Sequence, residues 1–115
     1  MQRYKMKYKE HQLQSSCIKW FNLQYPKGIM ISIPNASKRS VIEGAWMKAE
    51  GLTAGFPDSL IIFDDKILFV EFKIGKNKLT EKQAKMIERI ERNGFYVFVC
   101  RTFYEFVNTV NSCLK

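Results

Sequence analysis

The sequence is poor in the residues on which several kinds of site depend. It has one histidine, His11, so zinc sites rich in histidine and mechanisms that need two histidines are excluded. The three cysteines, Cys17, Cys100 and Cys113, show no CxxC spacing and indicate free thiols in a reducing compartment. No apolar run approaches the ~18 residues of a transmembrane helix, and the first residues lack the apolar core of a signal peptide. We therefore expect a cytoplasmic protein.

Linkers and repeats are missing as well. With six glycines and three prolines in 115 residues, the chain has no Gly/Ser/Pro-rich stretch. Hydrophobic residues make up 46% of the sequence and include nine phenylalanines, which is enough for a packed core. Disordered and collagen-like chains are therefore excluded, and we expect one domain over residues 1–115.

Acidic side chains are the scarcer charged class. Nineteen Lys and Arg stand against eleven Asp and Glu, which gives a net charge of +8. This excess indicates a polyanionic partner, either nucleic acid or an anionic membrane surface. The membrane alternative is disfavoured because the sequence shows no cationic amphipathic helix with exposed Trp or Phe.

Hydrophobic periodicity and turn signals predict a mixed α/β domain with a small central sheet. The expected helices are 7–25, 41–50, 80–92 and 102–114, and the expected strands are 29–33, 59–63, 67–74 and 95–100. We expect Cys17, Cys100 and both tryptophans, Trp20 and Trp46, to lie in the core.

The segment Ile67–Ile74 is apolar on both faces, which is typical of a central, covered strand. Glu71 and Lys73 nevertheless share one of these faces, because side chains two residues apart point the same way. Burying an unpaired charge costs several kcal/mol, so both residues need partners or a metal ion. The tight turn at 64–66 places Asp58 opposite Lys73 in one register and opposite Glu71 in the other.

Two carboxylates and a lysine at the end of a covered hairpin are the groups that metal-dependent phosphodiester cleavage requires. Carboxylate oxygens bind Mg²⁺ or Mn²⁺, and such an ion activates water and neutralises charge on the phosphate. Lys73 can orient or deprotonate the attacking water, or hold the phosphate. A salt-bridged strand end without catalysis is the alternative that spacing alone leaves open.

Two further residues have two interpretations each. Glu10 lies on one helical line with Gln14, Cys17 and Phe21, so it either points at the sheet as a third carboxylate or is a solvated residue near the helix start. Gln83 lies on the apolar side of its helix and either supports the lysine or a metal-bound water, or completes a capping box that begins at Thr80.

The basic residues divide into a helical stripe and two loops. Four cations share one face of the 80–92 helix, and they form either a solvated surface or a path for phosphates: Lys82, Lys85, Arg89 and Arg92. The loop residues that flank the expected site are our candidates for DNA contacts: Asn35, Lys38, Arg39, Lys76 and Lys78.

Taken in order, these segments resemble the motifs of the PD-(D/E)xK nuclease superfamily. They are Gly55-Phe56-Pro57-Asp58, Glu71-Phe72-Lys73 and Gln83, preceded by Glu10 with Gln14. The resemblance is in particular to small phage-like members of the VRR-NUC group, the virus-type replication–repair nucleases, and it runs nearly end to end. One difference is Val99-Cys100-Arg101, where that group has Val-Arg-Arg.

The resemblance implies a restriction-endonuclease-like core and an Mg²⁺- or Mn²⁺-dependent endonuclease without an organic cofactor. Asp58, Glu71, Glu10 and the Phe72 carbonyl would bind the metal, Lys73 would position the water and Gln83 would support it. It also implies a homodimer that cuts branched or junction DNA in replication, repair or recombination, in a bacterial or phage-infected cell. The alternative is a non-catalytic nucleic-acid-binding module of the same fold.

Overall fold

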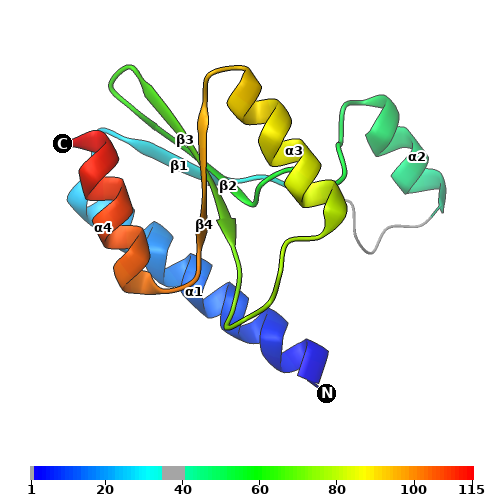
Figure 1. Cartoon of the computed structure of the whole chain (residues 1–115), viewed down its shortest axis with the longest axis horizontal. Helices are drawn as coiled ribbons and strands as arrows, with labels where there is room; N and C mark the ends of the chain where they lie inside the picture. The colour runs from blue at the N-terminus through cyan, green and yellow to red at the C-terminus, as the bar shows by residue number, and fades with distance from the viewer. Residues whose placement is uncertain (1, 35–40) are drawn as a thin grey trace.

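The computed structural model describes residues 2–34 and 41–115, with side chains from residue 5 onward. In chain order its elements are α1 (Gln2–Gln24), β1 (Ile29–Ser32), α2 (Val41–Ala49), β2 (Ser59–Phe63), β3 (Lys66–Phe72), α3 (Glu81–Arg92), β4 (Tyr96–Cys100) and α4 (Phe103–Leu114). The mixed α/β class and the order of elements expected from the sequence are confirmed (Figure 1).

The four strands form one mixed sheet in the order β1-β2-β3-β4. Strands β1, β2 and β3 pair antiparallel, whereas β4 lies parallel to β3. A parallel neighbour requires a crossover connection, and α3 provides it. Strand β3 is therefore an interior strand, and its carboxyl end leads directly into the loop before α3 (Figure 1).

The two faces of the sheet have separate cores. On one face α1 and α4 enclose the larger core, in which Phe21, Phe72 and Phe106 are fully buried. On the other face α3 packs Met86 and Ile90 against Val97. Because α3 covers the β3–β4 side, the β1–β2 side of this face stays open, as the exposed Ile29 and Ile31 show.

Helix α1 begins earlier than expected, at Gln2 rather than near residue 7. The segment 2–6 contains neither Pro nor Gly, so nothing interrupts the helix there. The other boundaries agree with the expected ranges to within two residues.

One of the two tryptophans is not where the sequence pattern placed it. Trp20 packs against the larger core, as expected, but Trp46 on α2 is 67% exposed. No residue of α2 is buried, and its apolar Val41, Ile42 and Trp46 are exposed in the described chain. The prediction for Trp46 was wrong because a helical pattern reveals an apolar face but not what covers it.

The two cysteines predicted to be in the core are there. Cys17 and Cys100 are fully buried, and the described structure contains no disulfide between them. No helix in the described residues is both long enough and apolar enough to cross a membrane.

Candidate catalytic site

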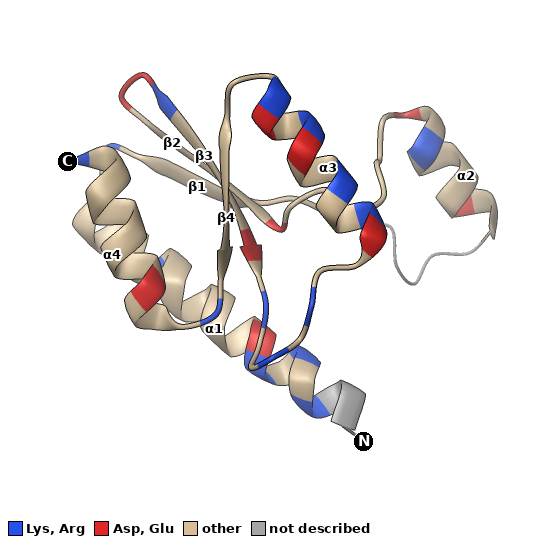
Figure 2. Cartoon of the chain, viewed as in Figure 1, with Lys and Arg blue, Asp and Glu red and all other residues tan. Residues whose placement is uncertain are grey.

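The hairpin register brings Asp58 to Glu71. Ser59 pairs with Val70 across the hairpin, so the residue before Ser59 lies opposite Glu71. The turn therefore occupies Asp64–Asp65, which confirms one of the two registers that the sequence left open. The Phe72 backbone N–H donates to Asp58 Oδ2 at 2.8 Å and fixes this carboxylate against the end of β3. Asp58, just before β2, consequently lies beside Glu71, near the end of β3, and Figure 2 shows acidic residues at both positions.

Lys73 directly follows β3 and points to the same side as Glu71. Its Nζ lies 3.9 Å from Glu71 Oε2, and the two residues are only 6% and 2% exposed. The Lys73 backbone N–H donates to the Cys100 carbonyl at 3.0 Å, which continues the pairing of β3 with β4 by one residue. The structure thus assembles a buried lysine and two carboxylates at one end of the sheet.

The capping-box interpretation of Gln83 is confirmed, and the same side chain also contacts the site, at Glu71 rather than at Lys73. Its Oε1 accepts from the Thr80 N–H at 2.9 Å while its own N–H donates to Thr80 Oγ1 at 3.1 Å, which completes the capping box. Its Nε2 donates to Glu71 Oε2 at 3.2 Å. A single amide therefore caps α3 and holds the buried carboxylate.

Glu10 approaches this group from α1, on the other side of the sheet end. Its side chain is half-buried, and its carboxyl interacts electrostatically with Asp58 and Lys73. One turn further along the helix, Gln14 Nε2 donates to Ser59 Oγ at 3.3 Å and secures the helix against β2. Glu10 thus points toward the site, as the first of its two interpretations expects.

The electrostatics of the site favour protonated carboxyls. Burial, followed by the neighbouring Asp58, raises the pKa of Glu71 to about 8. Burial also raises the pKa of Asp58, against the opposing effects of the Phe72 N–H and Lys73. For Glu10, burial and the nearby Asp58 raise the pKa, while Lys73 and Lys7 lower it.

A divalent cation fits one specific feature of this arrangement. Glu71 Oε1 is buried and has no N–H or O–H donor from another residue type among the described residues; the neighbouring Asp58 is itself a carboxyl and can bond to Glu71 only through a shared proton, which a cation would replace. Glu71 Oε1 belongs to a pair of carboxylates, the ligand type that Mg²⁺ and Mn²⁺ prefer. In the described part of the chain no three Asp, Glu, His or Cys side chains form a group able to hold a metal. Protein ligation would therefore centre on Asp58 and Glu71.

The basic loop after β3 is held by a residue to which the sequence assigned no role. Arg101 Nη1 donates to the carbonyls of Gly75 and Asn77 at 2.8 and 2.7 Å. It thereby ties the loop that carries Lys76 and Lys78, both exposed, to the end of β4. Every residue has a backbone carbonyl, so a sequence pattern does not show which carbonyls an arginine will bind. The only sequence signal at Arg101 is the difference from Val-Arg-Arg.

The remaining residues considered as DNA contacts precede α2 in the sequence or lie on α3. Asn35, Lys38 and Arg39 lie outside the described residues, so their proposed DNA contacts stay predictions. On α3, Lys85 pairs with Glu81 at 3.1 Å and Arg92 with Glu88 at 3.8 Å, all four side chains being largely exposed. This pairing favours the interpretation of the α3 stripe as a solvated surface.

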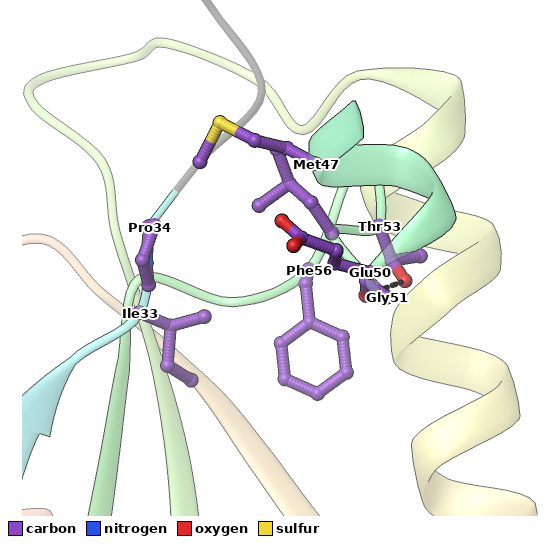
Figure 3. A pocket seen from close by; sticks show the side chains of 8 residues that line it. Ile33, Pro34, Met47, Glu50, Gly51, Thr53 and Phe56 are labelled. Carbon is purple, nitrogen blue, oxygen red and sulfur yellow. Dashed lines mark hydrogen bonds between the residues drawn. The ribbon is translucent and has the colours of Figure 1, made fainter. Parts of the chain in front are cut away.

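A separate cavity of about 390 Å³ lies between the end of β1, the end of α2 and the loop before β2. Ile33, Met47, Glu50 and Phe56 are among the residues that line it, and the Phe56 ring points away from α2 (Figure 3). None of Asp58, Glu71 and Lys73 lines this cavity. Because the buried Glu71 and Lys73 do not face this cavity, we place the candidate site at the carboxylate pair and not in the cavity.

The fold defines the class of the protein, a mixed α/β domain with a four-stranded sheet flanked by helices. The sequence profile of the VRR-NUC domain matches residues 1–103. The chain therefore belongs to the VRR-NUC domain family. This family is of the nuclease type, which implies DNA as the substrate.

Solved structures show the same fold. One, described as a VRR_NUC domain protein, superposes with a TM-score of 0.70 at 21% identity, over 90% of this chain and 85% of that one. A second, described as a VRR_NUC domain, has a TM-score of 0.66 at 23% identity, over 90% and 95% of the two chains. No curated protein matches the sequence.

The raised pKa of Glu71 predicts how stability depends on pH in EDTA. Between its ordinary pKa of 4.5 and about 8, the unfolded chain has lost this proton and the folded chain retains it. The free energy of unfolding is therefore expected to fall as pH rises through this range. Each pKa unit corresponds to about 1.4 kcal/mol, so the loss should amount to a few kcal/mol at most. Urea denaturation at several pH values measures it.

The Glu71→Gln variant is the control, since its side chain cannot ionise. It should show a much smaller loss of stability between pH 5 and 8. Wild-type stability that stays constant or rises over this interval would contradict the assignment.

The backbone at Gly55, three residues before Asp58, lies close against the first turn of α3, and we expect the stability of the protein to depend on this contact. Its φ is +81°, and a Cβ there would lie 2.7 Å from the Lys82 carbonyl atoms and 3.0 Å from Gln83 N. Gly51 has φ +105° but open space around it, so Gly51→Ala introduces the backbone strain without the clash. We expect Gly55→Ala to cost roughly 1–3 kcal/mol more than Gly51→Ala in urea unfolding. Equal losses would show that α3 does not depend on this close approach.

Proposed function

We propose that this chain is a divalent-metal-dependent endodeoxyribonuclease whose ion, Mg²⁺ or Mn²⁺, is held by Asp58 and Glu71. The observation that carries the proposal is Glu71 Oε1, a buried carboxylate oxygen without an N–H donor among the described residues. Retaining a carboxylate in that state is costly unless a ligand completes its surroundings. The Phe72 carbonyl, between Glu71 and Lys73, is the expected further ligand, and Glu10 the expected third carboxylate.

Each residue of the site then has a defined task. When bound, the ion supplies positive charge to the phosphate under attack and makes water a better nucleophile. Gln83 holds Glu71 in place through Oε2 and leaves Oε1 free for the ion. Lys73, at 3.9 Å from Glu71, orients the attacking water or takes its proton.

Branched or junction DNA is the proposed substrate, as the resemblance to small phage-like VRR-NUC proteins implies. A net charge of +8 on 115 residues supports a substrate dense in phosphates. The second candidate is a nucleic-acid-binding module without activity. The burial of Lys73 beside Glu71 disfavours it, because DNA binding alone requires neither a buried lysine nor a buried carboxylate.

Cleavage assays on a four-way junction, a flap and a linear duplex test the proposal. We expect cutting in Mg²⁺ or Mn²⁺, none in EDTA, and a preference for the branched substrates. Lys73→Ala should lower the rate by roughly 10² or more, in the range typical of a lost acid–base or positioning group.

Lys66→Ala is the matched control, since Lys66 is exposed at the opposite end of the same strand, and it should cut as wild type does. Metal-dependent cutting that survives in Lys73→Ala would contradict the assigned mechanism. Tight DNA binding without cutting in either metal would favour the non-catalytic alternative. Circular dichroism of each variant separates lost chemistry from lost folding.

We also propose that two copies associate through the open part of the sheet. Ile29, Ile62 and Ile67 form one row across β1, β2 and β3, and Ile31 begins the next row. Ile29 and Ile31 are 53% and 48% exposed. Because each copy carries +8, two copies approach each other most easily over such an uncharged, apolar surface.

Light scattering coupled to size exclusion tests the dimer. The wild type should have twice the 13.5 kDa mass of one chain. Ile31→Asp should restore the single-chain mass. Ser32→Asp adds the same charge to the opposite side of the same strand and should leave the dimer intact. A wild type that stays monomeric at every concentration would rule out this association.

A further inference from the structure

The first turns of α1 extend past the sheet at its catalytic end. A helix of 23 residues is roughly 34 Å long, whereas the longest strand has seven residues and spans roughly 23 Å. The first fully buried side chain on the described part of α1 is Cys17. Residues 5–9 are all exposed, and we call this segment the α1 overhang. Figure 1 shows α1 passing the end of β3 before it reaches this segment.

The inward-facing line of α1 connects the overhang to the carboxylates. This line passes through residues 7, 10, 14, 17 and 21, with alternating spacings of three and four. Phe21 and Cys17 are buried, Gln14 bonds to Ser59, and Glu10 interacts electrostatically with Asp58. The next position outward is Lys7, which also interacts with Glu10. The overhang, residues 5–9, is therefore directly adjacent to Glu10, the outermost candidate residue of the site.

Three of the five residues in the overhang are lysines, and two of them, Lys5 and Lys9, form no ion pair in the described structure. Lys5 and Lys9 lie one turn apart, where like charges repel each other on a helix. None of the ion pairs in the described structure includes either of them, in contrast to Lys85 and Arg92 on α3. Two exposed lysines of the overhang, Lys5 and Lys9, thus carry charge that no described ion pair offsets, which favours an anionic partner.

The loop after β3 is a second basic segment. It carries Lys76 and Lys78, and Arg101 holds it in place. Figure 2 shows basic segments both at the start of α1 and in this loop. A DNA strand whose phosphate reaches Asp58 and Glu71 can follow this basic surface on either side of the site.

We propose that the α1 overhang binds the phosphate backbone of the substrate DNA through Lys5, Lys7 and Lys9, beside the scissile phosphate. This inference rests on the proposed nuclease function and adds to it a substrate-binding surface on α1. The contacts are made to phosphates, so they strengthen binding to every DNA sequence equally.

Salt dependence of DNA binding tests the proposal directly. A fluorescein-labelled four-way junction is titrated in EDTA, which prevents cutting, at several KCl concentrations. The Lys5→Ala/Lys9→Ala double variant should bind several-fold more weakly. The slope of log Kd against log salt should fall by about one for each lost phosphate contact, or about two in total. Lys7 is left intact because its removal would also alter the field at Glu10.

Two controls isolate the effect of charge on the overhang. Lys66→Ala removes one cation at the far end of β3 and should keep the wild-type slope. Lys5→Arg/Lys9→Arg keeps both charges and should also keep it. Alanine is the best helix former, so the Ala substitutions preserve the helix. An unchanged slope in the Ala double variant, or an equal fall in Lys66→Ala, would overturn the proposal.

Two more measurements separate this inference from the nuclease proposal and from membrane binding. If wild type never cuts DNA but the slope still falls in the double variant, the nuclease proposal fails and the overhang still binds DNA. If wild type cuts and the slopes are equal, only the overhang proposal fails. Anionic vesicles of phosphatidylserine serve as the competing partner. Overhang-dependent binding to vesicles but not to DNA would also overturn it.

Discussion

Burial of the Glu71 carboxyl group is the constraint on which the candidate site of this domain depends. The group is almost fully buried next to a second carboxylate, an arrangement that desolvation and like charge both oppose. The neighbouring contacts reduce that cost: Lys73 supplies positive charge, the Phe72 N–H holds Asp58, and Gln83 binds Oε2. One oxygen, Glu71 Oε1, has no N–H donor in the described residues and faces a second carboxyl, so a cation there would replace a shared proton.

The same contacts connect the site to the fold. Gln83 uses one end of its amide to cap α3 and the other to hold Glu71, so the start of the helix and the geometry of the carboxylate cannot change independently. The close approach of Gly55 to the Lys82 backbone fixes where that helix starts relative to Asp58. Residues that look like ordinary helix-start and turn signals therefore carry site geometry as well, which explains why capping and catalysis seemed to be competing interpretations of Gln83.

Much of the architecture follows from local signals. The hairpin, the capping box and the periodic helices are each encoded within a few consecutive residues, and all are present. The hairpin register was open because a shift of the two-residue turn by one position exchanges Glu71 for Lys73 opposite Asp58. The exposure of Trp46 depends on the absence of a covering surface among the described residues, which no local pattern contains. Arg101 acts on backbone carbonyls, which every residue has, so its role was invisible before the loop was placed.

Helix α1 is continuous from the core to the candidate site and contributes side chains to both. Its second half packs Cys17 and Phe21 into the core, and its first half carries Glu10 to the carboxylates. Glu10 lies seven residues before Cys17, roughly 10 Å along the helix axis. A small tilt caused by repacking at Cys17 would be transmitted along this lever to Glu10 as a displacement. Substitutions deep in the core can therefore alter the position of Glu10 without contacting the candidate site.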